Sequence, residues 1–427
     1  MADEKPDPIT LYAELLTNLR TCTFFASLNT DSNAETRATM ASDGQTVTVT
    51  HEGQEATMRL PMTMGGGGEA ALMLPANPSK ELTMRLVLTE RETGLICFDE
   101  TSEDLVPWGA DRVKGRVVCR CGRELVQGVQ EWRDLPREGW AEMMDFWHCH
   151  KPHEEGDHKD VAAKKGYGAS RGVTALESIG LVGLTYFVVS EQDCTGIKAS
   201  RFFHSHDGRA RLRCEKCDSV VGVVDKLAEG WRLYKWAVGV KTGDEVETFK
   251  VQKWVTALLG AGIENSGGRR FVVEDEDEGG EKGALLLWVF TDDLAFSSSV
   301  GHTERQDPTR AMKIFWKRIP NPKQLLEEHH FQYEHLPLPT NVYTDIEATL
   351  ERSADMLPQS ARKFQDWDVG MLEKFGNRDL GFESVEDGSV EEATGQMSGL
   401  NMGEMEAMET AAEREVKMVE GGEGLLE

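Results

Sequence analysis

Two short pairs of cysteines, Cys119 with Cys121 and Cys214 with Cys217, stand far apart in this chain of 427 residues. Each pair follows a run that favours a β-strand, residues 115–118 before the first and residues 210–213 before the second. Zn²⁺ takes four soft ligands at about 2.3 Å, so two hairpin tips with two thiols each can close one tetrahedral site. The sequence therefore predicts one structural zinc ion that joins the two tips. The alternative is four unrelated buried thiols.

The segment around Cys149 offers a second kind of chemistry. Cys149 lies between His148 and His150, directly after an amphipathic helix that is predicted to start at residue 136. The three side chains can ligate metal and compete for the zinc ion. An adjacent imidazolium can also lower the pKa of the Cys149 thiol and supply a thiolate for nucleophilic attack. Cys149 is therefore the candidate catalytic residue, against the alternative of an inert, packed thiol.

Three other polar clusters lack an active-site pattern. The three serines at 297–299, near His302, lack the G-x-S-x-G elbow of a hydrolase nucleophile, which favours a polar turn. The histidine pair at 329–330 lacks H-E-x-x-H spacing and favours the exposed end of a helix. The four glycines at 65–68 lack the Lys-Ser/Thr of a phosphate loop and indicate a flexible insertion. A zinc ion held by four thiolates has no open position and should be structural.

Composition excludes some partners. With 47 basic and 74 acidic residues the net charge is −27, which disfavours direct binding of nucleic acid or of an anionic membrane surface. No segment approaches the roughly 20 apolar residues of a membrane span, and no signal peptide is expected at the start. In a long chain for which no signal peptide is expected, eight cysteines indicate free or metal-bound thiols and therefore a reducing compartment. We therefore expect a location in the cytoplasm, the nucleus or both.

The elements that position these residues are predicted to form an α+β protein. Residues 1–8 are expected to be a disordered tail, and residues 9–115 a β-rich sandwich or open barrel. That domain contains a long edge strand at 15–27, followed by strands at 46–50, 55–60 and 81–88. The zinc ion is expected to staple this part to the mixed α/β C-terminal half of the chain.

Residues 116–240 are expected to form the zinc-containing β region, with an inserted helix and an exposed loop at 154–172. A turn is predicted at 132–136, and strands are predicted at 180–189, 198–203, 210–213, 220–224 and 232–240.

Residues 241–376 are expected to be an α+β C-terminal domain that ends in helices, before an acidic disordered tail at 377–427. Its predicted strands are 269–273, 284–290 and 310–319, with a solvated acidic turn at 274–278. Its predicted helices are 248–261, ended by Gly260 or Gly262, and then 324–329, 344–356 and 360–375.

Several blocks, taken in order, resemble one family. They are residues 12–16 with Asn18 and Arg20, the Cys119-x-Cys121 pair, residues 132–140 leading to 145–151, residues 183–186, the Cys214-x-x-Cys217 pair, and residues 233–236, 286–290, 308–313 and 360–369. In this arrangement the chain resembles the HECT-like family of proteins that bind ubiquitin-conjugating enzymes. The resemblance covers residues 9–375 and leaves out the acidic tail.

The resemblance implies two different roles. One is a ubiquitin ligase that takes ubiquitin from its conjugating-enzyme partner through a thioester on a cysteine. No cysteine follows Cys217, so the candidates are Cys149, then Cys194, Cys22 and Cys97. The other is a non-catalytic assembly factor or adaptor. Fungal members resemble a yeast factor important for cleavage and polyadenylation, which implies the endonuclease of pre-mRNA 3′-end processing as a partner.

Overall fold

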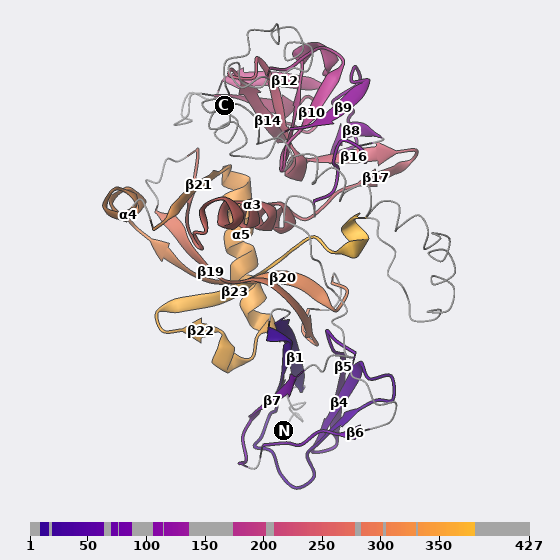
Figure 1. Ribbon diagram of the computed structural model, residues 1–427, viewed down its shortest axis with the longest axis vertical. Helices are drawn as coiled ribbons and strands as arrows, with labels where there is room; N and C mark the ends of the chain where they lie inside the picture. The colour runs from indigo at the N-terminus through magenta and orange to yellow at the C-terminus, as the bar shows by residue number, and fades with distance from the viewer. Residues whose placement is uncertain are drawn as a thin grey trace, which may run out of the picture. The chain divides into compact units, whose positions relative to one another are not determined.

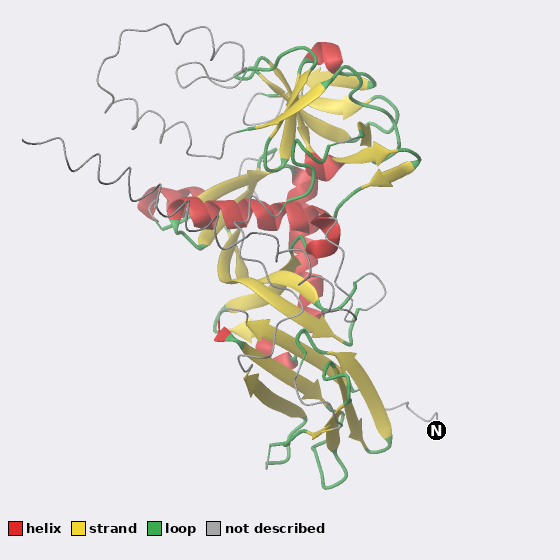
Figure 2. Ribbon diagram, turned by 45° about the vertical axis from the view of Figure 1, so that its right-hand side comes forward, coloured by secondary structure: helices red, strands yellow, loops and turns green. Residues whose placement is uncertain are grey.

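The computed structural model describes residues 9–16, 19–63, 70–75, 77–87, 106–113, 115–135, 174–201, 209–277, 283–301, 305–329 and 332–380. Contacts divide the chain into two units, Met1–Gly381 and Phe382–Glu427, and the second unit lies outside the described residues. Strands far outnumber helices in the described part (Figure 2), so the prediction of a β-rich protein is confirmed.

A nine-stranded sheet joins the beginning of the chain to its later part (Figure 1). Its main path runs β22-β23-β20-β19-β1-β2-β7, and β18 pairs with both β19 and β21. The strands are β1 Thr10–Leu16, β2 Thr21–Ser27, β7 Glu81–Val87, β18 Arg270–Asp275, β19 Ala284–Ser298, β20 Thr309–Ile319, β21 Glu334–Leu338, β22 Lys363–Phe364 and β23 Trp367–Glu373.

A small four-stranded sheet packs against the first strands. It has the order β5-β4-β3-β6, with β3 Arg37–Met40, β4 Thr46–His51, β5 Gln54–Arg59 and β6 Ala70–Ala71. Alternation along β4 buries Val47 and Val49, which share one apolar core with Leu11, Leu15 and Phe24 of the nine-stranded sheet.

The middle of the chain forms two further sheets. The seven-stranded sheet has the order β12-β13-β14-β15-β11-β10-β9. Its strands are β9 Glu131–Asp134, β10 Ile179–Val182, β11 Tyr186–Val189, β12 Ile197–Arg201, β13 Ala210–Cys214, β14 Val220–Asp225 and β15 Gly230–Tyr234. The three-stranded sheet consists of β8 Arg116–Cys119, β16 Val238–Thr242 and β17 Glu245–Glu247.

Helices cover the nine-stranded sheet. Helices α3 Val251–Ser266 and α5 Thr340–Ser353 share the largest apolar core with Leu285, Leu287 and Val289 of β19. Helix α4 Pro322–His329 packs on the opposite face, against Leu286. Short 3₁₀ turns are η2 Glu191–Asp193, η3 Lys235–Ala237, η5 Ala354–Met356, η6 Gln359–Ala361 and η7 Asn377–Leu380.

The prediction of one long edge strand at 15–27 is wrong. The chain instead makes a hairpin of β1 and β2, and β1 lies inside the sheet between β2 and β19. Leu11 and Leu15 enter the core shared with the small sheet, whereas Tyr12 enters a core on the other face. A strand buried on both faces shows little alternation, which explains the error.

Three predictions in the middle of the chain are also wrong. Residues 132–136 were expected to turn, but β9 pairs in parallel with β10 there. Residues 180–189 form two strands, because the chain turns after Gly183, whose N–H donates to the carbonyl oxygen of Tyr186 at 2.8 Å. Residues 232–240 are broken by the 3₁₀ turn η3 at Lys235–Ala237.

In the C-terminal half the predicted helix at 360–375 is wrong, because β22 and β23 occupy it. Strand β23 borders β20, and Gly370 lets helix α5 approach so closely that an added Cβ would lie 2.9 Å from Leu350. Helix α3 runs past Gly260 and Gly262 and ends at Gly267, whose φ of 73° suits glycine.

Two polar segments are less exposed than expected. Glu274 and Asp275 of the predicted solvated turn are buried at the end of β18, and Arg211 pairs with the following Glu276. The predicted serine turn at 297–299 is partly strand, since Ser297 and Ser298 are buried in β19.

The remaining predictions fall partly outside the described residues. These are the tail at 1–8, the glycines at 65–68, the helix from 136, the loop at 154–172 and the tail beyond residue 380. The division of the chain into five regions stays a prediction. Leu380, placed in the tail by the sequence, is buried, and its carbonyl oxygen accepts a hydrogen bond from Arg112.

Lys235 is an unusual core residue, with 1% of its surface exposed. Its ammonium donates to the carbonyl oxygens of Trp108 at 3.2 Å and of Pro107 at 3.5 Å. The same ammonium lies 5.2 Å from the ring centre of Phe187 and 5.5 Å from that of Trp254. Burial lowers the pKa of Lys235 to about 7, against the opposing effect of Asp134.

Replacing this ammonium should change how stability depends on pH. The folded pKa of about 7 lies below the unfolded value of about 10.4. Between these values the unfolded chain binds more protons, so the stability of the wild type rises with pH, and below pH 7 the burial cost is fully present. We expect Lys235→Met to stabilise the protein most at pH 6.5, by on the order of a few kcal/mol, and to keep only a small part of that advantage at pH 9.5.

Thermal unfolding of the variant and the wild type at both pH values checks this. Lys226→Met, on an exposed turn, is the matched control and should show no such trend. If Lys235→Met changes the unfolding midpoint equally at both pH values, the lowered pKa of Lys235 in the folded protein is contradicted.

Candidate metal centre and neighbouring surface

The four cysteines of the two pairs come together in space. The sulfur atoms of Cys119, Cys121, Cys214 and Cys217 all lie within 4.8 Å of one another. Two distances between the pairs are 3.6 Å, from Cys119 Sγ to Cys217 Sγ, and 3.7 Å, from Cys121 Sγ to Cys214 Sγ. Ligands at about 2.3 Å from a tetrahedral ion stand about 3.8 Å apart. The cluster can therefore hold one metal ion.

Two similar turns present these thiols. After β8, the N–H of Gly122 donates to the carbonyl oxygen of Cys119 at 2.7 Å, and Gly122 has a φ of 82°. After β13, the N–H of Asp218 donates to the carbonyl oxygen of Cys214 at 2.9 Å, and Asp218 has a φ of 61°. In both cases a residue in the left-handed region reverses the chain close to the thiols.

Polar contacts hold the two turns against each other. Lys216 Nζ donates to the carbonyl oxygen of Cys121 at 3.0 Å, and Arg123 pairs with Glu215 at 3.6 Å. The first turn ends a strand of the three-stranded sheet, and the second joins β13 to β14 of the seven-stranded sheet. The cluster thus connects two sheets that share one apolar core.

The environment of the four sulfurs is uneven. Cys119 and Cys214 are buried, whereas Cys217 is exposed. Burial raises the pKa of the Cys119 thiol well above its usual value, and hydrogen bonding to Ser219 lowers the pKa of Cys217 to about 6. A bound divalent cation favours the thiolate form of every ligand and offsets the cost of burying charge at Cys119. Four thiols without an acidic or imidazole ligand are the donor set that suits zinc.

The other described thiols are poor nucleophiles. Burial is the main cause that raises the pKa of Cys22 and of Cys194 to about 12, so little thiolate is present near neutral pH. Cys97 and the cluster of His148, Cys149 and His150 lie outside the described residues. The candidate role of Cys149 therefore stays a prediction.

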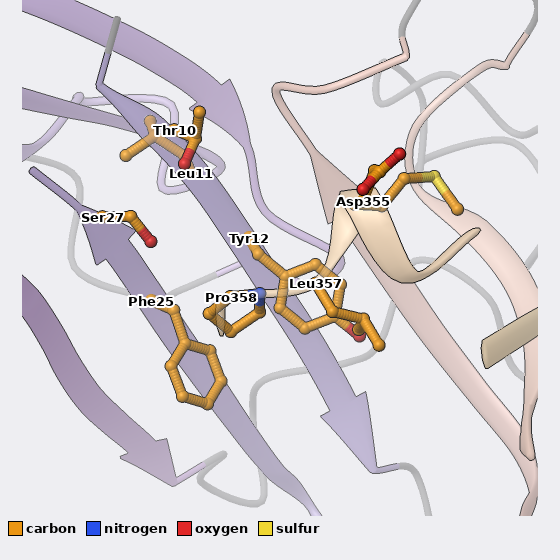
Figure 3. A pocket seen from close by; sticks show the side chains of 9 residues that line it. Thr10, Leu11, Tyr12, Phe25, Ser27, Asp355, Leu357 and Pro358 are labelled. Atoms are coloured by element: carbon orange, nitrogen blue, oxygen red, sulfur yellow. The ribbon is translucent and has the colours of Figure 1, made fainter. Parts of the chain in front are cut away.

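A small hollow lies between the β1–β2 hairpin and the turn η5 (Figure 3). Its lining includes Tyr12, Asp355 and Pro358, and the space that it leaves for water-sized molecules is only about 10 Å³. Sites for small molecules commonly enclose about 300 Å³ or more, and the lining holds no imidazole or thiol. This hollow is not a candidate active site.

A more distinctive surface is a strip of five aromatic residues on the nine-stranded sheet, Trp288, Phe290, Phe315, Phe364 and Trp367. We call this set the aromatic strip. Its rings touch in sequence: Phe290 stacks on Phe315 at 4.7 Å between ring centres, and Phe315 on Phe364 at 5.1 Å. Trp288 meets Phe315 edge-on at 5.3 Å and Trp367 at 6.0 Å.

Part of the aromatic strip faces solvent. Phe290 is 51% exposed and Phe364 is 44% exposed. The register between β19 and β20 shifts from Val289 to Thr291, so Phe290 sits at a bulge without a partner residue on β20. Such bulges redirect a side chain out of the sheet. Lys317 lies over the Trp367 ring at 4.4 Å and Arg270 over the Trp288 ring at 5.5 Å.

The sequence analysis did not identify this strip. The alternation of Trp288 and Phe290 in β19 was a usable signal, because residues two apart in a strand share a face. It was missed because residues 360–375, which contain Phe364 and Trp367, were predicted to form a helix.

Comparison with known proteins places the chain in a family. The family model for HECT-like ubiquitin-conjugating enzyme (E2)-binding proteins matches residues 14–369. The chain belongs to this family of HECT-like E2-binding proteins, and the resemblance seen in the sequence is confirmed. Among the helices that the structure describes, none has the length and apolar character needed to cross a membrane.

Two curated fungal proteins are similar to this chain. An uncharacterized protein of Schizosaccharomyces pombe is 25% identical over 289 residues, which cover 64% of this chain and 79% of the relative. An uncharacterized protein of Saccharomyces cerevisiae is 25% identical over 258 residues, which cover 58% of this chain and 66% of the relative. No solved structure matches significantly.

Removing one thiol should test the metal centre. Cys217 is exposed, so Cys217→Ser loses little packing, and its main effect is the loss of a ligand. We expect the purified wild type to contain about one metal ion per chain. The variant should lose the metal and several kcal/mol of stability, because metal binding contributes to folding free energy.

Elemental analysis and thermal unfolding measure both effects. Cys194→Ser, at a thiol outside the cluster, is the control and should keep the metal. Full metal content in Cys217→Ser would rule out four-thiolate ligation.

Proposed function

We propose that this protein binds a ubiquitin-conjugating enzyme, and that a structural zinc ion at the four cysteines stabilises the fold that does so. The observation that carries the proposal is the family match over residues 14–369, which includes both the cysteine cluster and the aromatic strip. A zinc ion with four thiolate ligands keeps no open position, so its role is architectural and not catalytic.

The aromatic strip is the surface we assign to the conjugating enzyme. Exposed aromatic side chains together with arginine are typical of the residues that dominate binding energy at protein interfaces. Phe290 and Phe364 are held in place by stacking on the buried ring of Phe315, so little side-chain entropy is lost when they are covered.

Neighbouring elements frame this surface. Trp367 packs against the apolar cluster that also receives Leu325 and Leu326 of α4, and Phe315 belongs to the cluster that contains Leu357. Phe290 of β19 and Phe364 of β22 stay exposed beside the buried Phe315 of β20. The exposed side chain of Arg270 adds a cation at the rim, in a chain whose overall charge is strongly negative.

Truncating the two exposed phenylalanines should weaken the complex. We expect Phe290→Ala combined with Phe364→Ala to raise the Kd for a conjugating enzyme by about tenfold or more, since central aromatic anchors each contribute more than about 1 kcal/mol. Titration calorimetry against a panel of purified conjugating enzymes measures this.

Leu227→Ala is the matched control, because Leu227 is 89% exposed on the turn between β14 and β15. Unchanged affinity in the double variant would exclude the aromatic strip as the docking surface. If no conjugating enzyme binds the wild type, the proposed function itself is wrong. A change in oligomeric state of the double variant would show instead that the strip joins two copies of this chain.

A more specific proposal is that the protein also acts as a ubiquitin ligase, which requires a reactive thiol to form the thioester. Of the six cysteines in the described residues, four form the metal cluster and two have a pKa of about 12. A thioester would therefore form at Cys149 or at Cys97, and we retain Cys149 as the candidate because of its flanking histidines.

The thiol is tested with a conjugating enzyme that carries ubiquitin. If the protein is a thioester ligase, Cys149→Ala should abolish a reducible ubiquitin adduct, detected on non-reducing gels, while Cys194→Ala leaves it intact. Persistence of the adduct in Cys149→Ala but not in Cys97→Ala would move the role to Cys97.

A second candidate function is a non-catalytic adaptor for the endonuclease of mRNA cleavage and polyadenylation. It is favoured by the pKa of about 12 of both described thiols outside the metal cluster and by the net charge of −27, which suits a basic partner. Under this hypothesis the wild type, with all its thiols intact, forms no reducible ubiquitin adduct. The endonuclease would then co-purify with the wild type and with Cys149→Ala alike.

A further inference from the structure

Two of the close sulfur contacts in the metal cluster share one property: each joins the first turn to the second. Cys119 Sγ lies 3.6 Å from Cys217 Sγ, and Cys121 Sγ lies 3.7 Å from Cys214 Sγ. Both pairs span more than ninety residues of sequence, since the separations are 98 and 93. Disulfides made from these contacts would bridge the same two turns that a metal ion bridges.

We propose that oxidation replaces the metal ion by two disulfides, Cys119–Cys217 and Cys121–Cys214, which keep the two turns joined. This inference rests on the zinc ion proposed above. The cluster is then a redox-dependent site that releases zinc without losing its architectural role. Disulfides within each pair, Cys119–Cys121 and Cys214–Cys217, would instead leave the turns uncoupled.

The chemistry balances with a peroxide as the oxidant. One thiolate attacks hydrogen peroxide, which gives a sulfenic acid and one hydroxide ion. A second thiolate attacks that sulfur and expels another hydroxide ion, so two thiolates lose two electrons and one peroxide is reduced. Repeating this at the second pair consumes four thiolates and two peroxides, forms two disulfides and four hydroxide ions, and frees Zn²⁺.

Exposure indicates where the sequence of events begins. Cys217 is the exposed member of the cluster, whereas its contact partner Cys119 is buried. Peroxide therefore reaches Cys217 first, and the sulfenic acid forms beside Cys119. Loss of these two ligands leaves the metal ion with Cys121 and Cys214 alone, which is too few for tight binding. The remaining pair then oxidises in turn.

Other contacts favour the pairing between turns over the pairing within them. The bond from Lys216 Nζ to the carbonyl oxygen of Cys121 and the ion pair of Arg123 with Glu215 hold the turns side by side. Backbone bonds at Cys119 and at Cys214 keep each turn closed while the sulfurs move. Closing either contact to about 2.05 Å then needs mainly side-chain rotation.

The experiment uses the full chain, purified under reducing conditions, with a zinc indicator dye, peptide mapping of disulfides and thermal unfolding. We expect hydrogen peroxide to release about one equivalent of zinc and to produce the Cys119–Cys217 and Cys121–Cys214 peptides. The unfolding midpoint of this oxidised form should stay close to that of the zinc form. A chelator with a reducing agent should instead lower the midpoint clearly, because neither metal nor disulfide remains.

Two results would overturn the inference. One is a map dominated by disulfides within each pair, and the other is an oxidised midpoint as low as that of the chelated, reduced protein. Cys97→Ser with Cys149→Ser removes competing thiols and should leave the result unchanged. A reduced wild type without bound zinc contradicts the zinc proposal and with it the release step, whereas the disulfide map of the same sample still decides the pairing.

Discussion

The approach of two short turns, one after β8 and one after β13, is the constraint on which the middle of the molecule depends. Four sulfur atoms meet there within 4.8 Å, and they come from strands of two different sheets. Neither turn has enough apolar side chains of its own to dock by burial. Their alignment rests on Lys216, Arg123 and the sulfurs themselves. The apolar core behind them, which includes Cys119 and Cys214, continues through α3 and α5 to β19. Order at the cluster is therefore linked by continuous packing to the nine-stranded sheet.

The second organising feature is the position of β1. Its backbone pairs with β2 on one side and with β19 on the other, so residues 12–15 are joined to residues 295–298 in an antiparallel ladder. Alternate side chains of β1 fill two different cores: Leu11 and Leu15 on one face, Tyr12 on the other. Lys313 of β20 also pairs with Glu14 across the sheet. The start of the chain is thus an integral part of the same sheet that carries the aromatic strip.

The sequence predicted features that depend on neighbouring residues, and it did not predict contacts between distant segments. The C-x-C and C-x-x-C spacings identified four residues that do meet, since metal-binding turns are short and local. Alternation found β4, β5 and β7 within a residue or two, because each has one buried and one exposed face. It failed for β1 and β23, whose two faces are both covered. No local pattern shows that Gly370 receives α5 or that β1 inserts beside β19. The family resemblance was found only because blocks spread over 350 residues were considered together.

The described thiols offer little free thiolate, whereas two aromatic rings are exposed to solvent, and this difference bears on the function that the fold supports. Catalysis by a thiol needs an accessible thiolate, but the buried Cys22 and the partly buried Cys194 both have a pKa of about 12. A metal ion at the cluster would occupy the other four described sulfurs. The nine-stranded sheet, in contrast, exposes Phe290 at a bulge and Phe364 on its edge, both stacked on a buried ring. Exposing such rings carries a solvation cost that a monomeric protein normally avoids, so a partner that covers them explains why they remain. The described residues thus include exposed aromatic rings, whereas both of their thiols outside the metal cluster have a pKa of about 12. Transfer of ubiquitin through a thioester would therefore need a reactive thiol from outside those residues.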